Sequence, residues 1–208
     1  MKSTTAQAFL PRGRSLSALR AAAEKCQGCA LYRSATQVVF GEGPAHARLM
    51  LIGETPGDEE DLAGRPFVGA AGRLLDQLLQ EAGIDRAQTY VTNAVKHFKW
   101  TPRGKRRLHA KPNSREINAC RPWLEAEMSC IDPQLIVCLG ATAAQALLGR
   151  DFRITRRRGE FHPGREGGQI LATYHPSAVL RAPDDRRRRT MRAQLLRDLR
   201  KAAAWLAK

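Results

Sequence analysis

Polar side chains able to carry acid, base or hydrogen-bonding chemistry follow several short apolar runs of this chain. Glu54 and Asp58 come after the run 48–52, Asn93 follows residues 90–92, and His175 follows residues 170–173. Carboxylates, a carboxamide and an imidazole can together stabilise both signs of charge in a reaction. The same residue types also form turns, so their placement in the fold decides whether they act together.

Hydrophobic patterning predicts that strands alternate with helices along the chain. Short apolar runs predict strands over residues 48–52, 90–92, 135–139 and 170–173. The helical spacing of other apolar residues predicts helices over 15–25, 70–82, 113–130, 141–148 and 190–206, the first capped by Ser15. This alternation indicates an α/β fold, a three-layer α/β/α sandwich around a four-stranded parallel sheet.

Such a sheet gives the polar residues a common position. Ligands of open α/β sheets bind just beyond the carboxyl ends of the strands. The segments at those ends are 53–58, 93–96, 140–142 and 174–177. We therefore expect Glu54, Asp58, Asn93 and His175 to converge on one rim of the sheet.

The charge of the chain indicates the kind of partner. Its 208 residues include 35 Lys and Arg against 20 Asp and Glu, a formal net charge of +15. A strongly basic folded chain favours a polyanion, and we expect nucleic acid, because neutralising phosphates releases counterions. With 43% hydrophobic residues the chain can bury a core as a single domain over 1–208, which excludes disorder as its main state.

The sequence gives no sign of a membrane or secretory segment. No apolar run approaches the ~20 residues that cross a bilayer, and the N-terminus lacks the apolar centre of a signal peptide. We therefore expect a cytoplasmic protein with no membrane partner, and a monomer.

The densest basic segment spans residues 96–111, which hold seven Lys or Arg and no acid. Phe98 and Trp100 are interleaved with these charges and can stack on bases. The run 186–189 either extends the phosphate track or lies on a solvated helix face, and both interpretations remain open. The candidate phosphate contacts are Lys105, Arg106, Arg107 and Arg181.

The five cysteines, an odd number, do not fit a disulfide framework in a reducing compartment. Cys26 and Cys29 have the Cys-x-x-Cys spacing with which two thiolates hold one metal ion or cluster. Cys138 lies inside an apolar run and is expected to be a small buried side chain. The spacing predicts a metal or cluster site whose remaining ligands come from elsewhere.

Several strings, taken together and in order, make the chain similar to the uracil-DNA glycosylase superfamily over roughly residues 20–206. They are Gly53-Glu54-Thr55-Pro56-Gly57-Asp58-Glu59-Glu60-Asp61, then Gly64-Arg65-Pro66-Phe67-Val68-Gly69, and later His175-Pro176-Ser177. The chain resembles the iron–sulfur branch called family four and its offshoot UdgX. The resemblance implies the fold of that superfamily, uracil-DNA glycosylase activity in DNA repair, and uracil-containing DNA as the partner.

The resemblance also implies roles for the rim residues. It places Glu54 and Asp58 in the motif that activates water, with Thr55 and Gly57 beside the base. Phe67 of the second string would stack on the extruded uracil.

The base itself would be read by residues of the later strands. Asn93 presents a donor and an acceptor to the Watson–Crick edge of uracil, and His175 can donate a hydrogen bond to a uracil oxygen as negative charge develops there. Ser177, in the same string as His175, is a candidate DNA contact. Extruding the base costs least from a single strand, so we expect single-stranded DNA to be preferred.

The string Gly104-Lys105-Arg106-Arg107-Leu108-His109 is similar to the inserted loop that separates UdgX from turnover enzymes of family four. This implies that the protein excises uracil and then stays bonded to the deoxyribose C1′ through His109. The attacking imidazole must be neutral, and the adjacent Arg106 and Arg107 should disfavour its protonation. Glu54, within hydrogen-bond reach, would fix the ring tautomer and stabilise the cation formed after attack.

One position departs from both patterns. The residue after Glu54 is Gln in the UdgX pattern and commonly Ala in family four, but here it is Thr55. A hydroxyl is shorter than a carboxamide, so we expect base contacts or water placement to differ.

The resemblance completes the cysteine site. It implies a 4Fe-4S cluster held by Cys26, Cys29, His97 and Cys120, in which His97 stands where family four has a cysteine. The cluster would tie the N-terminal segment 1–30 to the helix that follows the basic loop. A zinc ion on the same four residues, or Cys130 as the fourth ligand, remains open.

Two other functions remain open beside covalent capture. The first is an ordinary turnover glycosylase of family-four type, in which a carboxylate of the first motif activates water. The second is a DNA-binding iron–sulfur protein that cleaves nothing. Uracil release and DNA trapping, measured together, distinguish the three.

Overall fold

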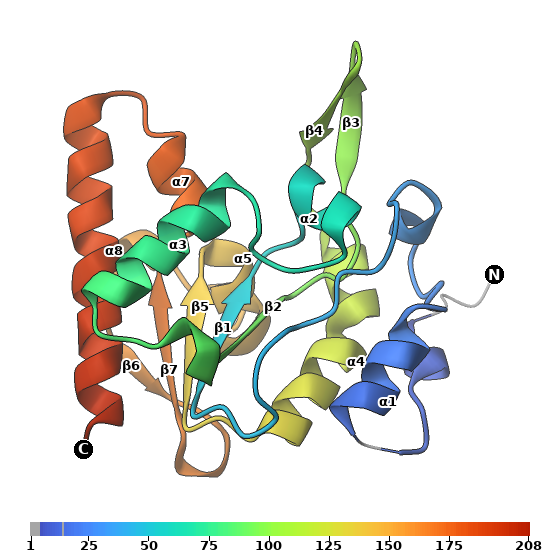
Figure 1. The fold of residues 1–208 in the computed structure, drawn as a ribbon, viewed down its shortest axis with the longest axis horizontal. Helices are drawn as coiled ribbons and strands as arrows, with labels where there is room; N and C mark the ends of the chain where they lie inside the picture. The colour runs from blue at the N-terminus through green and yellow to red at the C-terminus, as the bar shows by residue number, and fades with distance from the viewer. Residues whose placement is uncertain (1–4, 14) are drawn as a thin grey trace.

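A computed structural model describes residues 5–13 and 15–208, which fold around a five-stranded sheet (Figure 1). The strand order is β2-β1-β5-β7-β6. Four strands are parallel, namely β1 (Leu49–Gly53), β2 (Thr89–Asn93), β5 (Leu135–Leu139) and β7 (Gln169–Thr173). The fifth, β6 (Phe161–Pro163), is an antiparallel edge strand.

The predicted α/β fold is therefore confirmed, with one strand more than expected. The four parallel strands coincide with the four apolar runs, which are buried on both faces of the sheet. The sequence pattern gave no signal for β6 because three residues ending in Pro163 are too few to show a period.

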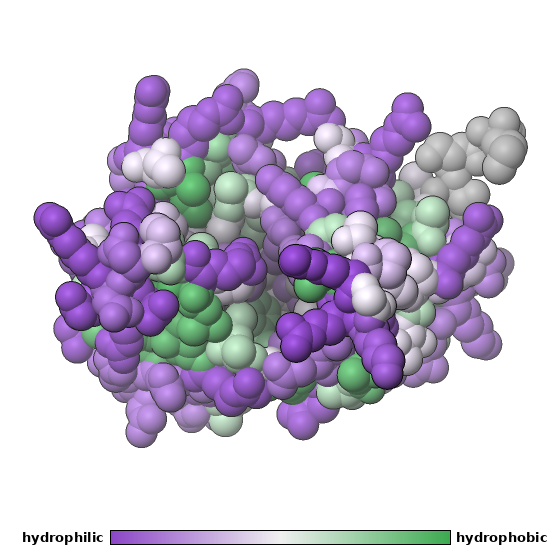
Figure 2. All heavy atoms as spheres, turned by 90° about the horizontal axis from the view of Figure 1, so that it is seen from above, coloured by the Kyte–Doolittle hydropathy of each residue, from purple (hydrophilic) through white to green (hydrophobic). Residues whose placement is uncertain are grey.

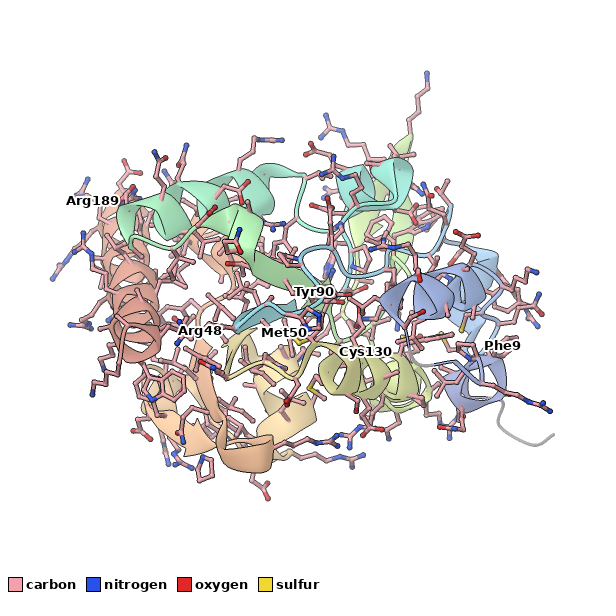
Figure 3. The ribbon with its side chains drawn as sticks, turned by 60° about the horizontal axis from the view of Figure 1, so that its bottom comes forward. Phe9, Arg48, Met50, Tyr90, Cys130 and Arg189 are labelled. Atoms are coloured by element: carbon pink, nitrogen blue, oxygen red, sulfur yellow. The ribbon has the colours of Figure 1, made fainter. Side chains whose placement is uncertain are left out.

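Helices cover both faces of the sheet. Side chains alternate along a strand, so Leu49 and Leu51 pack towards α3 (Ala70–Glu81) and α8 (Asp185–Leu206), while Met50 and Ile52 pack towards α4 (Ser114–Ile131) and α5 (Ala141–Leu148). Met50 and Tyr90, paired on neighbouring strands, lie on the α4 side near Cys130 in Figure 3. Burial of both faces explains why the parallel strands read as continuous apolar runs.

Side-chain caps fix several helix starts. Ser15 caps α1 (Leu16–Ala23) as predicted, and Asn113 forms a capping box with Glu116 at the start of α4. Helix α8 begins at Asp185, earlier than the predicted residue 190, because the Asp184 side chain accepts a hydrogen bond from the Arg187 amide. The arginine run 186–189 therefore belongs to the first turns of this helix, and Arg189 extends away from it in Figure 3.

A two-stranded hairpin stands clear of the sheet beside α2 (Asp58–Ala63) (Figure 1). Its strands are β3 (Trp100–Arg103) and β4 (Arg106–His109), and Trp100 pairs with His109 at its base. Gly104 has φ +58° at the tip, a backbone conformation that glycine adopts without strain. The hydrophobic pattern did not predict this hairpin, nor the short helices α2, α6 (Ile154–Arg157) and α7 (Pro176–Leu180).

The N-terminal segment packs on α4 through a third apolar cluster. The turn η1 (Ala6–Phe9) and helix α1 contribute Ala6, Leu19 and Ala23, which lie against Trp123. The remaining short turns are η2 (Ala30–Arg33), η3 (Arg86–Gln88) and η4 (Arg165–Gly167). Among the described residues, no helix is both long and apolar enough to span a membrane.

Candidate active site

A pocket of about 420 Å³ lies at the carboxyl edge of the parallel strands. Figure 2, which looks onto this edge, shows apolar atoms in a hollow ringed by hydrophilic side chains. All four predicted rim segments contribute to its lining. The predicted site residues among the lining are Glu54, Thr55, Gly57, Phe67, Asn93, His109, His175, Ser177 and Arg181.

Two glutamates line the pocket, and only one of them has a free oxygen. Glu60 is buried and accepts hydrogen bonds at both oxygens, from the amides of Gly57 at 3.0 Å and Gly69 at 2.7 Å. Glu54, at the end of β1, accepts one hydrogen bond from the Thr142 hydroxyl at Oε2. Its Oε1 faces the cavity towards His109, so Glu54 is the carboxylate available for chemistry.

His109 reaches the pocket from the base of the hairpin. Its Nε2 lies 3.8 Å from Glu54 Oε1, which is ion-pair distance and longer than a hydrogen bond. Burial lowers the pKa of His109, Glu54 opposes this effect, and Arg181 lowers the pKa further. The imidazole is therefore neutral at neutral pH, but burial and Arg181 are the cause rather than the expected Arg106 and Arg107.

His175 presents a fixed N–H to the pocket. Its Nδ1 accepts the Ser177 amide at 3.1 Å and lies 2.8 Å from the Ser177 hydroxyl, at the N-cap of α7. Burial lowers the pKa of His175 to about 4, so the ring is neutral. Because Nδ1 accepts a hydrogen bond, the single ring proton is on Nε2, where it can be donated to a ligand.

Asn93 and Phe67 form the wall that a planar base would contact. Phe67 stacks on His175, with ring centroids 5.9 Å apart and an interplanar angle of 26°. Asn93 is buried at the end of β2, and within the described part of the chain its carboxamide has no protein hydrogen-bond partner. The backbone of Phe67 has φ +58°, an uncommon conformation of the kind that functional sites retain.

Gly53 allows these two side chains to approach each other. A Cβ at Gly53 would lie 2.3 Å from Asn93 Oδ1 and 2.7 Å from Phe67 Cζ. Neither distance is tolerable for a side chain, so only glycine fits at this strand end.

Thr55 lines the pocket, but its hydroxyl is used within the protein. Oγ1 donates to the carbonyl of His97 at 2.9 Å, and the residue is buried. The side chain that replaces Gln or Ala of the related patterns thus ties the β1 loop to the segment before the hairpin.

Asp58 and Arg107 lie outside the pocket lining and pair with each other. Arg107 Nη2 is 2.5 Å from Asp58 Oδ1, an ion pair without hydrogen-bond alignment, and Nη1 donates to the fully buried Asp61 at 2.7 Å. The guanidinium also lies over the rings of Phe98 and Trp100. Asp58 thus faces the hairpin, outside the cavity lining, and Arg107 anchors the hairpin to α2.

Several cations of the basic segment 96–111 are paired with carboxylates of the protein. Lys96 is fully buried and paired with Glu127, and Lys99 pairs with Glu116 at 2.9 Å. With Arg107 also paired, the cations of the segment that remain exposed and outside these pairs are Arg103, Lys105, Arg106 and Lys111. Lys105 and Arg106 thus keep their predicted exposed positions near the hairpin tip.

A model of the uracil DNA glycosylase superfamily matches residues 40–200 of this chain. The chain belongs to this superfamily. It is 40% identical to a type-4 uracil-DNA glycosylase of Thermotoga maritima over 89% of this chain and 91% of that protein. It is 38% identical to a type-4 uracil-DNA glycosylase of Pyrobaculum aerophilum over 77% of this chain and 82% of that protein. A type-5 uracil-DNA glycosylase of the same organism is 28% identical over 66% of this chain and 64% of that protein.

Three of the four predicted cluster ligands, Cys26, Cys29 and Cys120, share the third apolar cluster. Burial raises the pKa of Cys120 to about 12, Lys96 opposes this effect, and the two other thiols add a smaller rise. Trp123 Nε1 donates to Cys26 Sγ at 3.2 Å, and the Lys96 amide donates to Cys120 Sγ at 3.2 Å. Sulfur atoms with N–H donors fit the thiolate ligands of an iron–sulfur cluster.

The fourth ligand is not assembled with them. Burial lowers the pKa of His97 to about 4, and Asp61 is the charged group that opposes this effect. In residues 5–13 and 15–208, no three His, Cys, Asp or Glu side chains are close enough to hold a metal ion, so neither a zinc site nor a cluster site is assembled there. Cys130 is ten residues after Cys120 on α4, about 15 Å along the helix axis, too far to share a cluster.

Glu60 and Thr142 are site residues that the sequence analysis did not single out. Glu60 stands in the first motif beside Asp58, and Thr142 stands in the predicted rim segment 140–142. Both were within reach of the sequence argument, but helix register and turn geometry decide which of several polar neighbours faces the cavity.

Proposed function

We propose that this chain excises uracil from DNA by hydrolysing its N-glycosidic bond, in the manner of the type-4 enzymes it is similar to. One observation carries the proposal. The pocket brings together a carboxylate with a free oxygen on Glu54, a donor N–H on His175 and an unpaired carboxamide on Asn93. Breaking this bond leaves positive charge on the sugar and negative charge on the base, and the site offers a group for each.

The base binds between the strand ends. Phe67 stacks on the extruded uracil, and the carboxamide of Asn93 reads its Watson–Crick edge. The C1′–N1 bond breaks with its electron pair passing to the base, and the Nε2–H of His175 stabilises the charge that develops on a uracil oxygen. A neutral imidazole suits this task, since it donates without needing to bind a proton first.

Glu54 acts on the sugar. Its ionised carboxylate stabilises the cationic deoxyribose, and as a base it takes a proton from the water that adds to C1′. Asp58 is not needed for this step, because its carboxylate is paired with Arg107 outside the pocket. The type-4 relatives support this hydrolytic route.

We further propose that His109 competes with water for the sugar and bonds to C1′. A ring nitrogen of the neutral imidazole supplies the electron pair for the new bond, and the imidazolium formed is stabilised by Glu54, 3.8 Å from Nε2. The position of His109 in the pocket lining supports this route, as does the Lys-Arg-Arg-Leu-His string that carries it. Exposed Lys105, Arg106 and Arg181 contribute phosphate contacts, with single-stranded DNA preferred.

One reaction separates these possibilities. Uracil-containing single-stranded DNA is incubated in excess over protein, and uracil released and DNA held in a heat- and detergent-stable band are measured together. Capture predicts one uracil and one trapped DNA per protein molecule, whereas turnover predicts many uracils and no stable band. Binding without any uracil release would reject both in favour of a non-catalytic DNA-binding protein.

The His109→Ser variant tests the capture step directly. The stable band should disappear while uracil release persists, because Glu54, His175 and Asn93 are untouched. An unchanged band would remove His109 from the reaction.

We also propose a 4Fe-4S cluster held by Cys26, Cys29 and Cys120, with His97 as the fourth ligand. The gathered thiols and their two N–H donors support the three cysteines, and the neutral imidazole supports His97. The cluster would tie the N-terminal segment to α4. Iron content and visible absorbance should be lost in Cys120→Ser, and a full cluster in His97→Ala would reject His97.

A further inference from the structure

We propose that Thr142 is a positioning residue that holds the Glu54 carboxylate so that its free oxygen faces His109 and the reacting sugar. The inference rests on the proposed function and deepens its account of Glu54. Thr142 is 3% exposed at the start of α5, and its hydroxyl donates to Glu54 Oε2. This hydrogen bond leaves Oε1 as the oxygen that faces His109 at 3.8 Å.

The turn that carries Thr142 lies between His175 and Glu54. Gly140 has φ +95°, and a Cβ there would lie 3.1 Å from the Cβ of His175. Its amide donates to the Thr173 carbonyl at 2.8 Å, which fixes the turn to the end of β7. In the β5–α5 turn, Gly140 therefore contacts His175 and Thr142 contacts Glu54. One segment thus positions both the group proposed to stabilise negative charge on the base and the group proposed to stabilise positive charge on the sugar.

A held carboxylate differs from a free one in its orientation. The terminal torsion of a glutamate is broad, so a partly exposed Glu54 without Thr142 would rotate among several orientations. With the orientation fixed, the reaction does not wait for the carboxylate to rotate into place.

The Thr142→Val variant removes the hydroxyl and keeps the branched shape. In single-turnover reactions at saturating uracil-DNA, both uracil release and adduct formation should slow by about 10-fold or more, as expected for loss of a hydrogen bond to a charged group. Thr142→Ser keeps a hydroxyl and should restore the rate.

Thr173 provides a matched control. It is also buried, at the end of β7, and its hydroxyl donates to the Asp198 carboxylate at 2.7 Å, away from the pocket. Thr173→Val removes the same kind of bond, so it should lower thermal stability in a similar way while leaving the single-turnover rate of uracil release unmoved. In a Glu54→Gln background, Thr142→Val should have much less effect, since Thr142 acts through Glu54.

The result that overturns the inference is a Thr142→Val protein with the single-turnover rate of wild type, or with that of Thr173→Val. A Thr142 effect of equal size in the Glu54→Gln background would also overturn it. Failure of the proposed function is seen separately, as a wild-type protein that releases no uracil. If Thr142→Val does not fold, Thr142→Ser and Thr142→Ala are compared by single-turnover rate, and equal rates would overturn the inference.

Discussion

Nε2 of His109 faces Oε1 of Glu54 across 3.8 Å, with no hydrogen bond between them. The imidazole and the carboxylate therefore lie on the same side of the pocket, and neither is engaged in a hydrogen bond with the other. A sugar cation formed there would meet a nucleophile and a counter-charge together.

The adduct-forming rate should depend on the protonation of His109. Only the neutral ring attacks, so the rate is constant above the lowered pKa of His109 and falls as pH drops through it. Arg181 is one of the charges that lower this pKa, so Arg181→Gln should raise the pKa and move the fall to higher pH. Single-turnover trapping at saturating DNA, from about pH 4 to pH 8, measures this shift. If the fall in rate stayed at the same pH in Arg181→Gln, or moved to lower pH, it would not be due to protonation of His109.

The hairpin should detach when Arg107 is replaced. Arg107→Gln leaves Asp61 buried without its cation, and we expect the free energy of unfolding to fall by about 3 kcal/mol. His109 moves with the hairpin, so adduct formation should fall more than uracil release does.

Arg106 is the matched control for that experiment. It is the exposed neighbour of Arg107 on β4, and Arg106→Gln should change stability by less than about 0.5 kcal/mol. Denaturant unfolding compares the two variants in stability, and trapping is compared at saturating DNA, where a weaker phosphate contact of Arg106 does not limit the rate. Equal losses of unfolding free energy in the two variants would contradict the anchoring role of Arg107.

A methyl group at Gly53 should disturb base recognition. Gly53→Ala places a Cβ against both Asn93 and Phe67, so uracil release should fall by about 100-fold, the scale expected for misplaced groups in a site. Gly13→Ala is the control, because a Cβ there meets nothing within 4 Å. The glycosylase rate on one uracil oligonucleotide compares them, and an unchanged Gly53→Ala rate would refute the fit.

The buried pair behind Asn93 should matter for stability. Lys96 is paired with Glu127 at complete burial and also donates to the Asn93 carbonyl at 2.7 Å. Lys96→Met should cost about 3 kcal/mol or more in unfolding free energy, because it leaves the Glu127 charge unpaired. Adding Glu127→Gln, which is neutral but still accepts hydrogen bonds, should recover part of that loss in denaturant titrations. A double variant less stable than Lys96→Met would contradict this view.

The sheet and the rim of the site could be predicted because apolar runs mark buried parallel strands. Once the strands were placed, the position of Glu54, Asn93 and His175 after them put these residues at one edge. The choice between Asp58 and Glu60 could not be made in this way. Both lie in one motif, and only the turns of α2 show that Glu60 reaches back to Gly57 while Asp58 faces the hairpin.

The basic segment shows a second limit of sequence reasoning. Composition alone treats its seven cations alike, yet Lys96, Lys99 and Arg107 each meet a carboxylate from a distant part of the chain. Side chains alternate between the two faces of a strand, so Arg107 and His109 lie on one face of β4 and Arg106 and Leu108 on the other. Because the β3–β4 hairpin was not predicted, this difference between the two arginines was not predicted either. Pairing partners far along the chain are set by the tertiary fold.

The residues proposed for excision lie at the ends of the sheet strands, whereas His109 lies on the β3–β4 hairpin beside them. The two parts are fastened chiefly by ion pairs on α2 rather than by the apolar core. The groups proposed for base removal and the one proposed for sugar capture thus stand on separately fastened parts of the structure. A chain with a shortened β3–β4 hairpin would keep Glu54, Asn93 and His175 at the strand ends, and a related scaffold with matching acids on α2 could accept the hairpin together with His109.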